Sequence, residues 1–235
     1  MAGSSDDQKR DKYRSFLDDE GEKNTRWSFG APPNYDVVDK LFEEGQTKVW
    51  PAGSLGEKVQ NLVKTFEMEI FHKASPEDYK SFDPMKLTLS LNGRKSMSVK
   101  EVGMIGGGYN FFMQTALPDP IRIYDPAHET ADSSHREFTT TFPRGFALEV
   151  LEVYTGPPQI VFKFRHWGYM EGPFKGHAPT GEMVELFGIG IYEVDKDMRI
   201  VKIDYFYDRG ELLGGLIKGS ASPSSVSCPL LRNTG

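Results

Sequence analysis

The sequence predicts an α+β protein in which about three N-terminal helices pack on a curved, cone-shaped antiparallel sheet. Helical patterns fill the first half of the chain, whereas alternating apolar and polar residues dominate from residue 137 onward. Short turns separate the alternating runs, which is typical of adjacent antiparallel hairpins. Helices followed by strands, without regular alternation between the two, favour the α+β class.

The first two helices have clear start signals. Residues 34–45 follow a Gly-Ala-Pro-Pro break, and Asn34 can cap the helix that they form. Ser54 and Glu57 have the spacing of a capping box, which satisfies free backbone amides at a helix start. The apolar residues that follow recur at helical spacing and predict one buried stripe: Val59, Leu62, Val63, Phe66 and Ile70.

A third helix is predicted after the short strand 86–91. Ser98 and Glu101 form a second capping box, and the glycines at 106–108 should weaken or kink the helix. Residues 118–136 are rich in Pro, Asp and His, which predicts a loop long enough to act as a lid.

Five strands are predicted in the second half of the chain: 138–142, 146–154, 160–169, 183–194 and 199–207.

The 235 residues are best divided into one domain with two less structured ends. Residues 1–25 are polar and highly charged, so we expect them to be mostly disordered. The domain then covers residues 26–219, and residues 220–235 form a loose tail.

Composition excludes several classes of partner and places the protein in the cytoplasm. A net charge of −6 argues against binding to nucleic acid and to anionic membrane surfaces. We find no apolar run long enough to span a bilayer and no secretory signal at the start of the chain. The single cysteine, Cys228, cannot form an intrachain disulfide, which fits a reducing compartment.

No metal or other cofactor is predicted. The five histidines include no pair at metal-ligand spacing on a predicted helix. The Gly106–Gly108 run lacks the strand, Lys and Ser/Thr that accompany a phosphate-binding loop.

Residues 166–182 read His-Trp-Gly-Tyr-Met-Glu-Gly-Pro-Phe-Lys-Gly-His-Ala-Pro-Thr-Gly-Glu, and a later strand ends at Asp208. The glycine spacing, this terminal Asp and the leucine-rich segment 210–217 resemble the SnoaL-like polyketide cyclases, which have the nuclear transport factor two-like fold. The resemblance implies a cone with an open mouth, which is a usual site for a hydrophobic ligand with a few polar anchors.

A second resemblance covers nearly all of the chain. Segments 21–25, 30–38, 48–55 and 164–177 resemble the plant pathogen-related proteins. This resemblance implies a plant source and a defence setting, but it supplies no reaction.

Two residues are candidates for proton transfer. The cyclase resemblance implies that Asp208 acts as an acid or base, and an apolar roof from Tyr205, Phe206 and Tyr207 would raise its pKa toward neutrality. The alternative is that Asp208 caps the helical segment after it. By strand alternation His166 shares a face with Phe162, so it is either a second proton carrier or a core histidine.

Further residues are candidates for shaping the pocket or its mouth. We expect Trp167, Tyr169, Met170, Tyr205 and Phe206 in this role, with His177 either at the pocket rim or exposed on its loop.

Three functions remain open from the sequence. The first is a cofactor-free cyclase, isomerase or lyase that acts on a hydrophobic, carbonyl-bearing metabolite. The second is a ligand-binding protein without catalysis, favoured because Met170 stands where many of the cyclases have a histidine. The third is a homodimeric interaction module, with Arg165, Trp167 and Tyr169 as anchors on the opposite sheet face.

Overall fold

A six-stranded sheet with the order β2-β1-β6-β5-β4-β3 forms the centre of the computed structural model, which describes residues 11–221. Consecutive strands from β3 to β6 pair antiparallel, as predicted, whereas β1 pairs parallel with β6. No hairpin joins β1 to β6, because helices intervene along the chain, so no tight turn sets the direction of β1. The strands are β1 Thr88–Leu91, β2 Met97–Ser98, β3 Ala147–Thr155, β4 Gln159–Tyr169, β5 Met183–Val194 and β6 Ile200–Tyr207.

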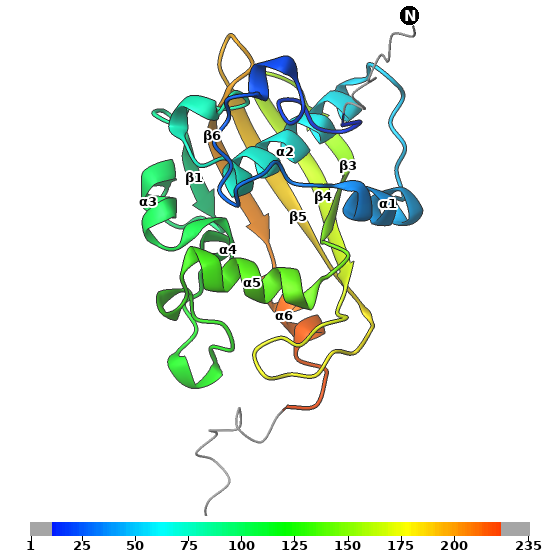
Figure 1. Ribbon diagram of the computed structural model, residues 1–235, viewed down its shortest axis with the longest axis vertical. Coiled ribbons are helices and arrows are strands. Elements are labelled where there is room, and N and C mark those ends of the chain that lie inside the picture. The colour runs from blue at the N-terminus through cyan, green and yellow to red at the C-terminus, as the bar shows by residue number, and fades with distance from the viewer. Residues whose placement is uncertain (1–10, 222–235) are drawn as a thin grey trace, which may run out of the picture.

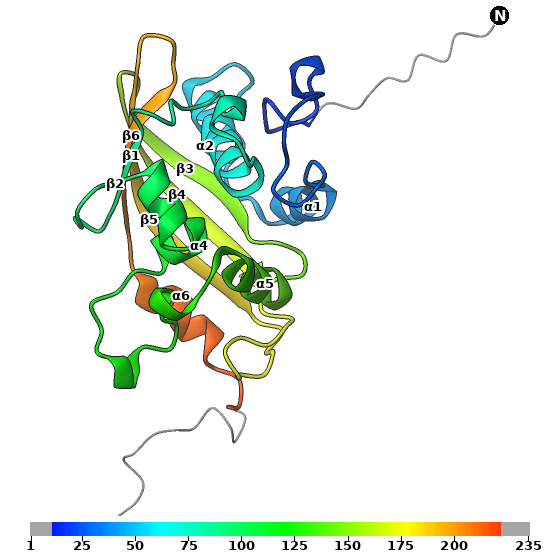
Figure 2. The ribbon, with the colours of Figure 1, turned by 60° about the vertical axis from the view of Figure 1, so that its left-hand side comes forward.

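Most helices cover one face of this sheet (Figure 1). Figure 2 shows α2, α4 and α5 on the same side, while the opposite face of β5 and β6 carries no helix. The α+β class is therefore confirmed. The helices are α1 Asp36–Gly45, α2 Leu55–His72, α3 Val99–Met104, α4 Gly107–Phe112, α5 Ala131–Thr141 and α6 Arg209–Leu216. Four short 3-10 turns lie at Glu20–Glu22, Pro76–Asp78, Asp119–Ile121 and Pro126–His128. Across residues 11–221, we find no helix with the length and apolarity needed to cross a membrane.

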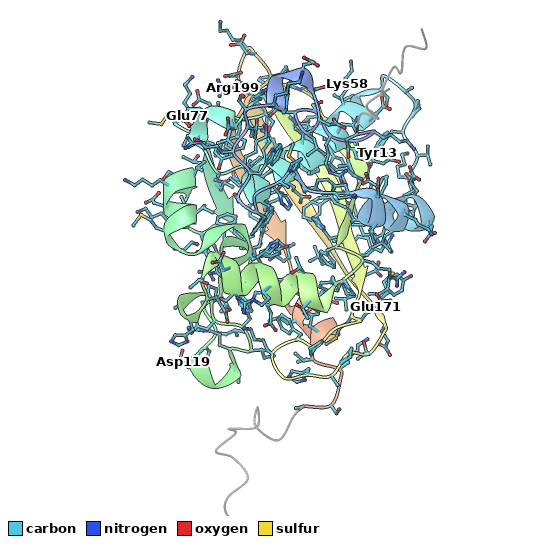
Figure 3. All side chains as sticks on the ribbon, in the orientation of Figure 1. Tyr13, Lys58, Glu77, Asp119, Glu171 and Arg199 are labelled. Carbon is cyan, nitrogen blue, oxygen red and sulfur yellow. The ribbon has the colours of Figure 1, made fainter. Side chains whose placement is uncertain are left out.

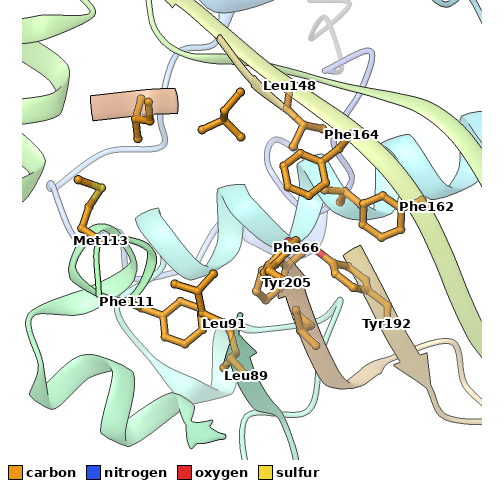
Figure 4. Close-up of a cluster of buried hydrophobic side chains, with 14 of the residues drawn as sticks. Phe66, Leu89, Leu91, Phe111, Met113, Leu148, Phe162, Phe164, Tyr192 and Tyr205 are labelled. Carbon is orange, nitrogen blue, oxygen red and sulfur yellow. Dashed lines mark hydrogen bonds between the residues drawn. The ribbon is translucent and has the colours of Figure 1, made fainter. Parts of the chain in front are cut away.

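The main hydrophobic core lies between α2 and the concave face of the sheet (Figure 4). Phe66 of α2 packs edge-on against Tyr192 of β5, with ring centroids 5.9 Å apart. Strand alternation directs Phe162 and Phe164 into this core and Trp167 to the opposite face, as predicted. There Trp167 packs against α1 in a second cluster with Leu41, Phe42 and Ala147.

The third predicted helix is present in two parts, α3 and α4. The capping box of Ser98 and Glu101 starts α3 as expected. Gly106 then adopts φ +89°, a left-handed conformation that only glycine takes without strain, and the chain changes direction there. The expected kink is therefore a complete break.

The predicted strand 138–142 is wrong, because these residues lie in and directly after α5. Thr130 and Ser133 form a capping box that starts this helix inside the predicted loop 118–136. Phe138 and Phe142 are one helical turn apart and both are buried, so the same residues satisfy a helical pattern.

Residues 11–25 are ordered, in contrast to the disorder expected for 1–25. The Arg14 guanidinium pairs with Asp39 of α1, and Leu17 and Glu22 are buried. Charged residues thus hold this segment through ion pairs, which the composition alone did not indicate. Residues 1–10 and 222–235, including Cys228, lie outside the described residues. Residues 220 and 221 close the described chain, and Ala221 pairs with His177 in an isolated β-bridge.

Candidate functional site

A cavity of about 470 Å³ lies between the concave face of the sheet and the helices that cover it. This volume is in the range of small-molecule sites. Its lining residues from β4, β5 and β6 are mostly buried, whereas Pro143, Asn34 and Val37 are exposed and mark the opening. Most lining side chains are apolar or aromatic: Phe71, Phe112, Met113, Phe138, Phe142, Phe146, Phe164, Leu186 and Leu212.

Glu67 and His166 bring a carboxylate and an imidazole together in this apolar wall. Glu67 projects from α2 and His166 from the concave face of β4, and Nε2 of His166 lies 3.2 Å from Oε1 of Glu67. Phe146 stacks on the imidazole with an interplanar angle of 8°. Nδ1 of His166 is buried and has no hydrogen-bond partner within residues 11–221. Both side chains remain partly exposed, so the pair can meet a molecule inside the cavity.

Tyrosine hydroxyls add polar groups to the cavity, but the protein already engages some of them. The Tyr205 hydroxyl is bonded to the Tyr192 hydroxyl, and the Tyr207 hydroxyl donates to the carbonyl of Phe112. Burial raises the pKa of Tyr109 to about 12 and also raises the pKa of Tyr205. These phenols therefore stay protonated near neutral pH and serve as hydrogen-bonding groups.

Two histidines that line the cavity, His72 and His135, pack against the exposed side chain of Phe29. Phe29 stacks on His135 of α5 with ring centroids 4.2 Å apart and meets the edge of His72 of α2. Burial lowers the pKa of His72 to about 4, and neighbouring His135 and Arg14 act in the same direction. Burial also lowers the pKa of His135. The opening is therefore lined by neutral rings at neutral pH.

The structure places Asp208 outside the cavity. Its side chain is exposed and accepts the amide hydrogen of Gly210, so it caps α6. The expected apolar roof is absent because Phe206 points to the open face of the sheet and Tyr207 points into the cavity. Of the two residues expected to transfer protons, only His166 lines the cavity.

Among the residues expected to bind ligand, only Tyr205 lines the cavity. Trp167 is covered by α1 on the other sheet face, and Tyr169 packs beside it under the guanidinium of Arg144. Met170 is fully buried in the main core. His177 lies on its loop, where Nδ1 is 3.1 Å from the carbonyl oxygen of Gly219. Phe206 is exposed on the opposite face of the sheet.

Glu67 is the site residue that the sequence pattern did not reveal. It lies four residues after Val63 and three before Ile70, so it shares the face of α2 that carries the predicted apolar stripe. A carboxylate at the margin of an apolar stripe is a signal for a polar group in a pocket.

Within residues 11–221, no group of three or more His, Cys, Asp or Glu is arranged to hold a metal ion.

Comparison with known proteins shows a relative over almost the whole chain. A curated protein named "Pathogen-related protein", from Hordeum vulgare, is 54% identical over 225 residues, which cover 94% of this chain and 95% of that protein. The chain belongs to the pathogen-related protein family. No family model matches the chain.

The resemblance to cyclases is found again among solved structures. A protein from Jannaschia sp. CCS1, provisionally named a SnoaL-like polyketide cyclase, is 15% identical and covers 60% of this chain and 76% of its own, with a TM-score of 0.37. A provisionally named polyketide cyclase from Acidithiobacillus ferrooxidans is 13% identical and covers 73% of this chain and 100% of its own, with a TM-score of 0.42.

Proposed function

We propose that this pathogen-related protein binds a hydrophobic, carbonyl-bearing metabolite in its cavity and acts on it as a cofactor-free acid/base catalyst. The observation that carries the proposal is the pair of Glu67 and His166, 3.2 Å apart in an otherwise apolar cavity of about 470 Å³. The name of the relative from Hordeum vulgare supports a role in plant defence. We place this role in the cytoplasm, because the single cysteine of the chain fits a reducing compartment.

The chemistry follows from the two side chains. A carboxylate inside an apolar cavity can accept a proton from an acidic carbon next to a carbonyl and return it at another position. An imidazole within ion-pair distance can hold that carboxylate in place or carry the proton onward. The hydroxyls of Tyr35 and Tyr109, which line the cavity and have no hydrogen bond within residues 11–221, can donate to the carbonyl oxygen of the metabolite. Isomerisation, cyclisation and related lyase steps all begin with such a proton transfer.

The first experiment is native mass spectrometry of protein purified from its own tissue, followed by denaturation and identification of any released molecule. An apolar, carbonyl-bearing compound at one per chain supports the proposal and provides a substrate to assay. A protein that is empty and binds no such compound in titrations contradicts it.

Substitutions in the pair then separate catalysis from binding. Glu67→Gln should lower turnover of the identified compound at least 100-fold with little change in its affinity, since one catalytic proton carrier contributes about 10²–10⁴-fold. Asp208→Asn is the matched control, because it replaces a carboxylate outside the cavity and an Asn can still cap α6. If the wild-type protein binds the compound and does not turn it over, the protein is a binding protein without catalysis, which is the alternative that Met170 favoured.

A further inference from the structure

Lys64 of α2 is a buried amino group that the proposed acid/base pair does not use. The residue is 3% exposed, because Phe42 of α1 and Tyr13 of the N-terminal segment cover it. Its Nζ lies 3.2 Å from the ring centroid of Phe42 and 4.4 Å from that of Tyr13. Figure 3 shows Tyr13 beside α1. Buried lysines are normally paired, yet within residues 11–221 this amino group has no hydrogen bond or ion pair.

The charged groups around Lys64 come from each element packed against it. Burial and the nearby Arg14 lower the pKa of Lys64 to about 7, while Asp39 of α1, Glu67 of α2 and Asp11 of the N-terminal segment act in the opposite direction. A substantial fraction of this side chain is therefore a neutral amine at neutral pH, which is the nucleophilic form.

A small side cavity places Lys64 next to the main cavity. It has a volume of about 60 Å³, and both Lys64 and Glu67 line it. Tyr35, Val38, Phe146 and Glu67 line both cavities, so the two adjoin. A volume equal to roughly two water molecules can hold a carbonyl group, but not a whole metabolite.

We propose that Lys64 is a nucleophile that forms an imine with an aldehyde or ketone whose apolar body occupies the main cavity. The amine lone pair forms the C–N bond as the carbonyl π electrons move to oxygen, which takes up a proton. The nitrogen then gives up its two protons, the oxygen takes up a second one, the C–O bond breaks as the C=N bond forms, and one water molecule leaves. No electrons are gained or lost overall. Glu67, one helical turn along α2, lines both cavities and can carry the proton between oxygen and nitrogen.

The test is reductive trapping on the full-length protein. The protein is incubated at pH 7 with hexanal and sodium cyanoborohydride, and the modified lysines are mapped by peptide mass spectrometry over time. Lys58 is the matched control, since it lies exposed on the same helix and is marked in Figure 3. Lys64 should be modified at least about 10-fold faster than Lys58, because an ordinary lysine is almost fully protonated at this pH.

Two further measurements complete the test. The preference for Lys64 should shrink as the pH approaches 10, where lysines with an ordinary pKa also become neutral. Lys64→Met should remove the fast adduct. Modification of Lys64 at or below the rate of Lys58 at pH 7, or a fast adduct that persists in Lys64→Met, overturns the inference. This measurement follows modification of Lys64 directly in the wild-type protein. The inference for Lys64 can therefore fail while the proposal for Glu67 and His166 stands, and that proposal can fail while the inference for Lys64 stands.

Discussion

Asp208 shows how the surroundings of one side chain limit what it can do. Its carboxylate is exposed and accepts the amide of Gly210 at 2.7 Å, an arrangement that satisfies a free donor at the start of α6. An exposed carboxylate of this kind is occupied with the cap and has no access to the cavity. The same residue type at Glu67 faces an imidazole inside the cavity, so position decides between a cap and a reactive group.

We expect Asp208→Ala to destabilise the protein by about 1 kcal/mol, the usual cost of losing an N-cap. Asp208→Asn should cost less than about half of that, because the amide oxygen can accept the same hydrogen bond. Chemical denaturation followed by circular dichroism measures both values. Weaker binding of the cavity ligand in Asp208→Asn would contradict the placement of this residue outside the site.

The N-terminal segment 11–25 is held to the rest of the domain by a buried ion network. Nζ of Lys73, at the end of α2, lies 2.9 Å from Glu22 and 2.8 Å from Glu69, and it also donates to the carbonyl of Asp78. The side chains of Lys73 and Glu69 are fully buried. Such a network specifies where the segment docks, because removing the Lys73 charge leaves the buried carboxylate of Glu69 without a cation.

Lys73→Met should therefore lower the free energy of unfolding by about 3–5 kcal/mol, the range seen when one partner of a buried ion pair is removed. Lys23→Met is the control, since Lys23 forms an exposed pair with Glu20 in the same segment and should cost less than about 1 kcal/mol. Urea denaturation of both variants gives the comparison. Equal losses would mean that the network does not hold the segment.

Residues 26–35 lie against α2 and α5 at the cavity opening, where Phe29 and Tyr35 pack on the ring of His72. The titration of this histidine makes the stability of the fold sensitive to acid. The pKa of His72 is about 4 in the folded protein and about 6.5 in an unfolded chain, so the unfolded state binds more protons between these values. Stability should be unaffected above pH 7 and should fall as the pH drops from about 6.5 to 4. At roughly 1.4 kcal/mol per pKa unit, the loss reaches at most about 3 kcal/mol.

Thermal unfolding between pH 4 and pH 8 checks this expectation in wild type and in His72→Gln. The variant should lose less stability on acidification, because the glutamine does not titrate. His128→Gln is the control, since His128 is exposed and lies away from the opening. A pH profile of His72→Gln identical to that of wild type would show that His72 does not carry the effect.

Elements with strong local signals could be predicted from the sequence, and elements set by distant contacts could not. The capping box of Ser98 and Glu101 predicted where α3 begins. Alternation along β4 predicted which side chains share a face of that strand. The buried pair Phe138 and Phe142 fits either period, so only packing on the sheet decided for α5. Alternation along β4 identified His166 as a candidate. Its partner Glu67 belongs to α2, far earlier in the chain, and no local sequence pattern indicates that the two side chains meet.

At the scale of the whole molecule, helices cover one face of the sheet, while the other face is covered by α1 at β3 and β4 and is open at β5 and β6. The concave face forms the core and the cavity. Figure 2 shows no helix over the other side of β5 and β6. Phe187 and Phe206 of these strands are 48% and 43% exposed. Ile189 pairs with Phe206 across these strands and lies two residues from Phe187, so the three share one face. Arg165 and Trp167, which were expected to be anchors on this face, are buried. Phe187, Ile189 and Phe206 therefore form its apolar surface.

We expect a second copy of the chain to cover this open face, so that the protein is a homodimer. Exposed apolar side chains on neighbouring strands match the central part of an interface, where aromatic residues contribute most of the binding free energy. Phe187→Asp should raise the dimer dissociation constant at least 100-fold, because it replaces an aromatic anchor with a charge that must lose its water in each copy. Met85→Asp, at an exposed apolar residue away from this sheet face, is the control. Sedimentation equilibrium over a range of concentrations measures both. A wild-type protein that sediments as a monomer at every concentration would leave the open face to solvent and would remove dimerisation from the functions considered for this fold.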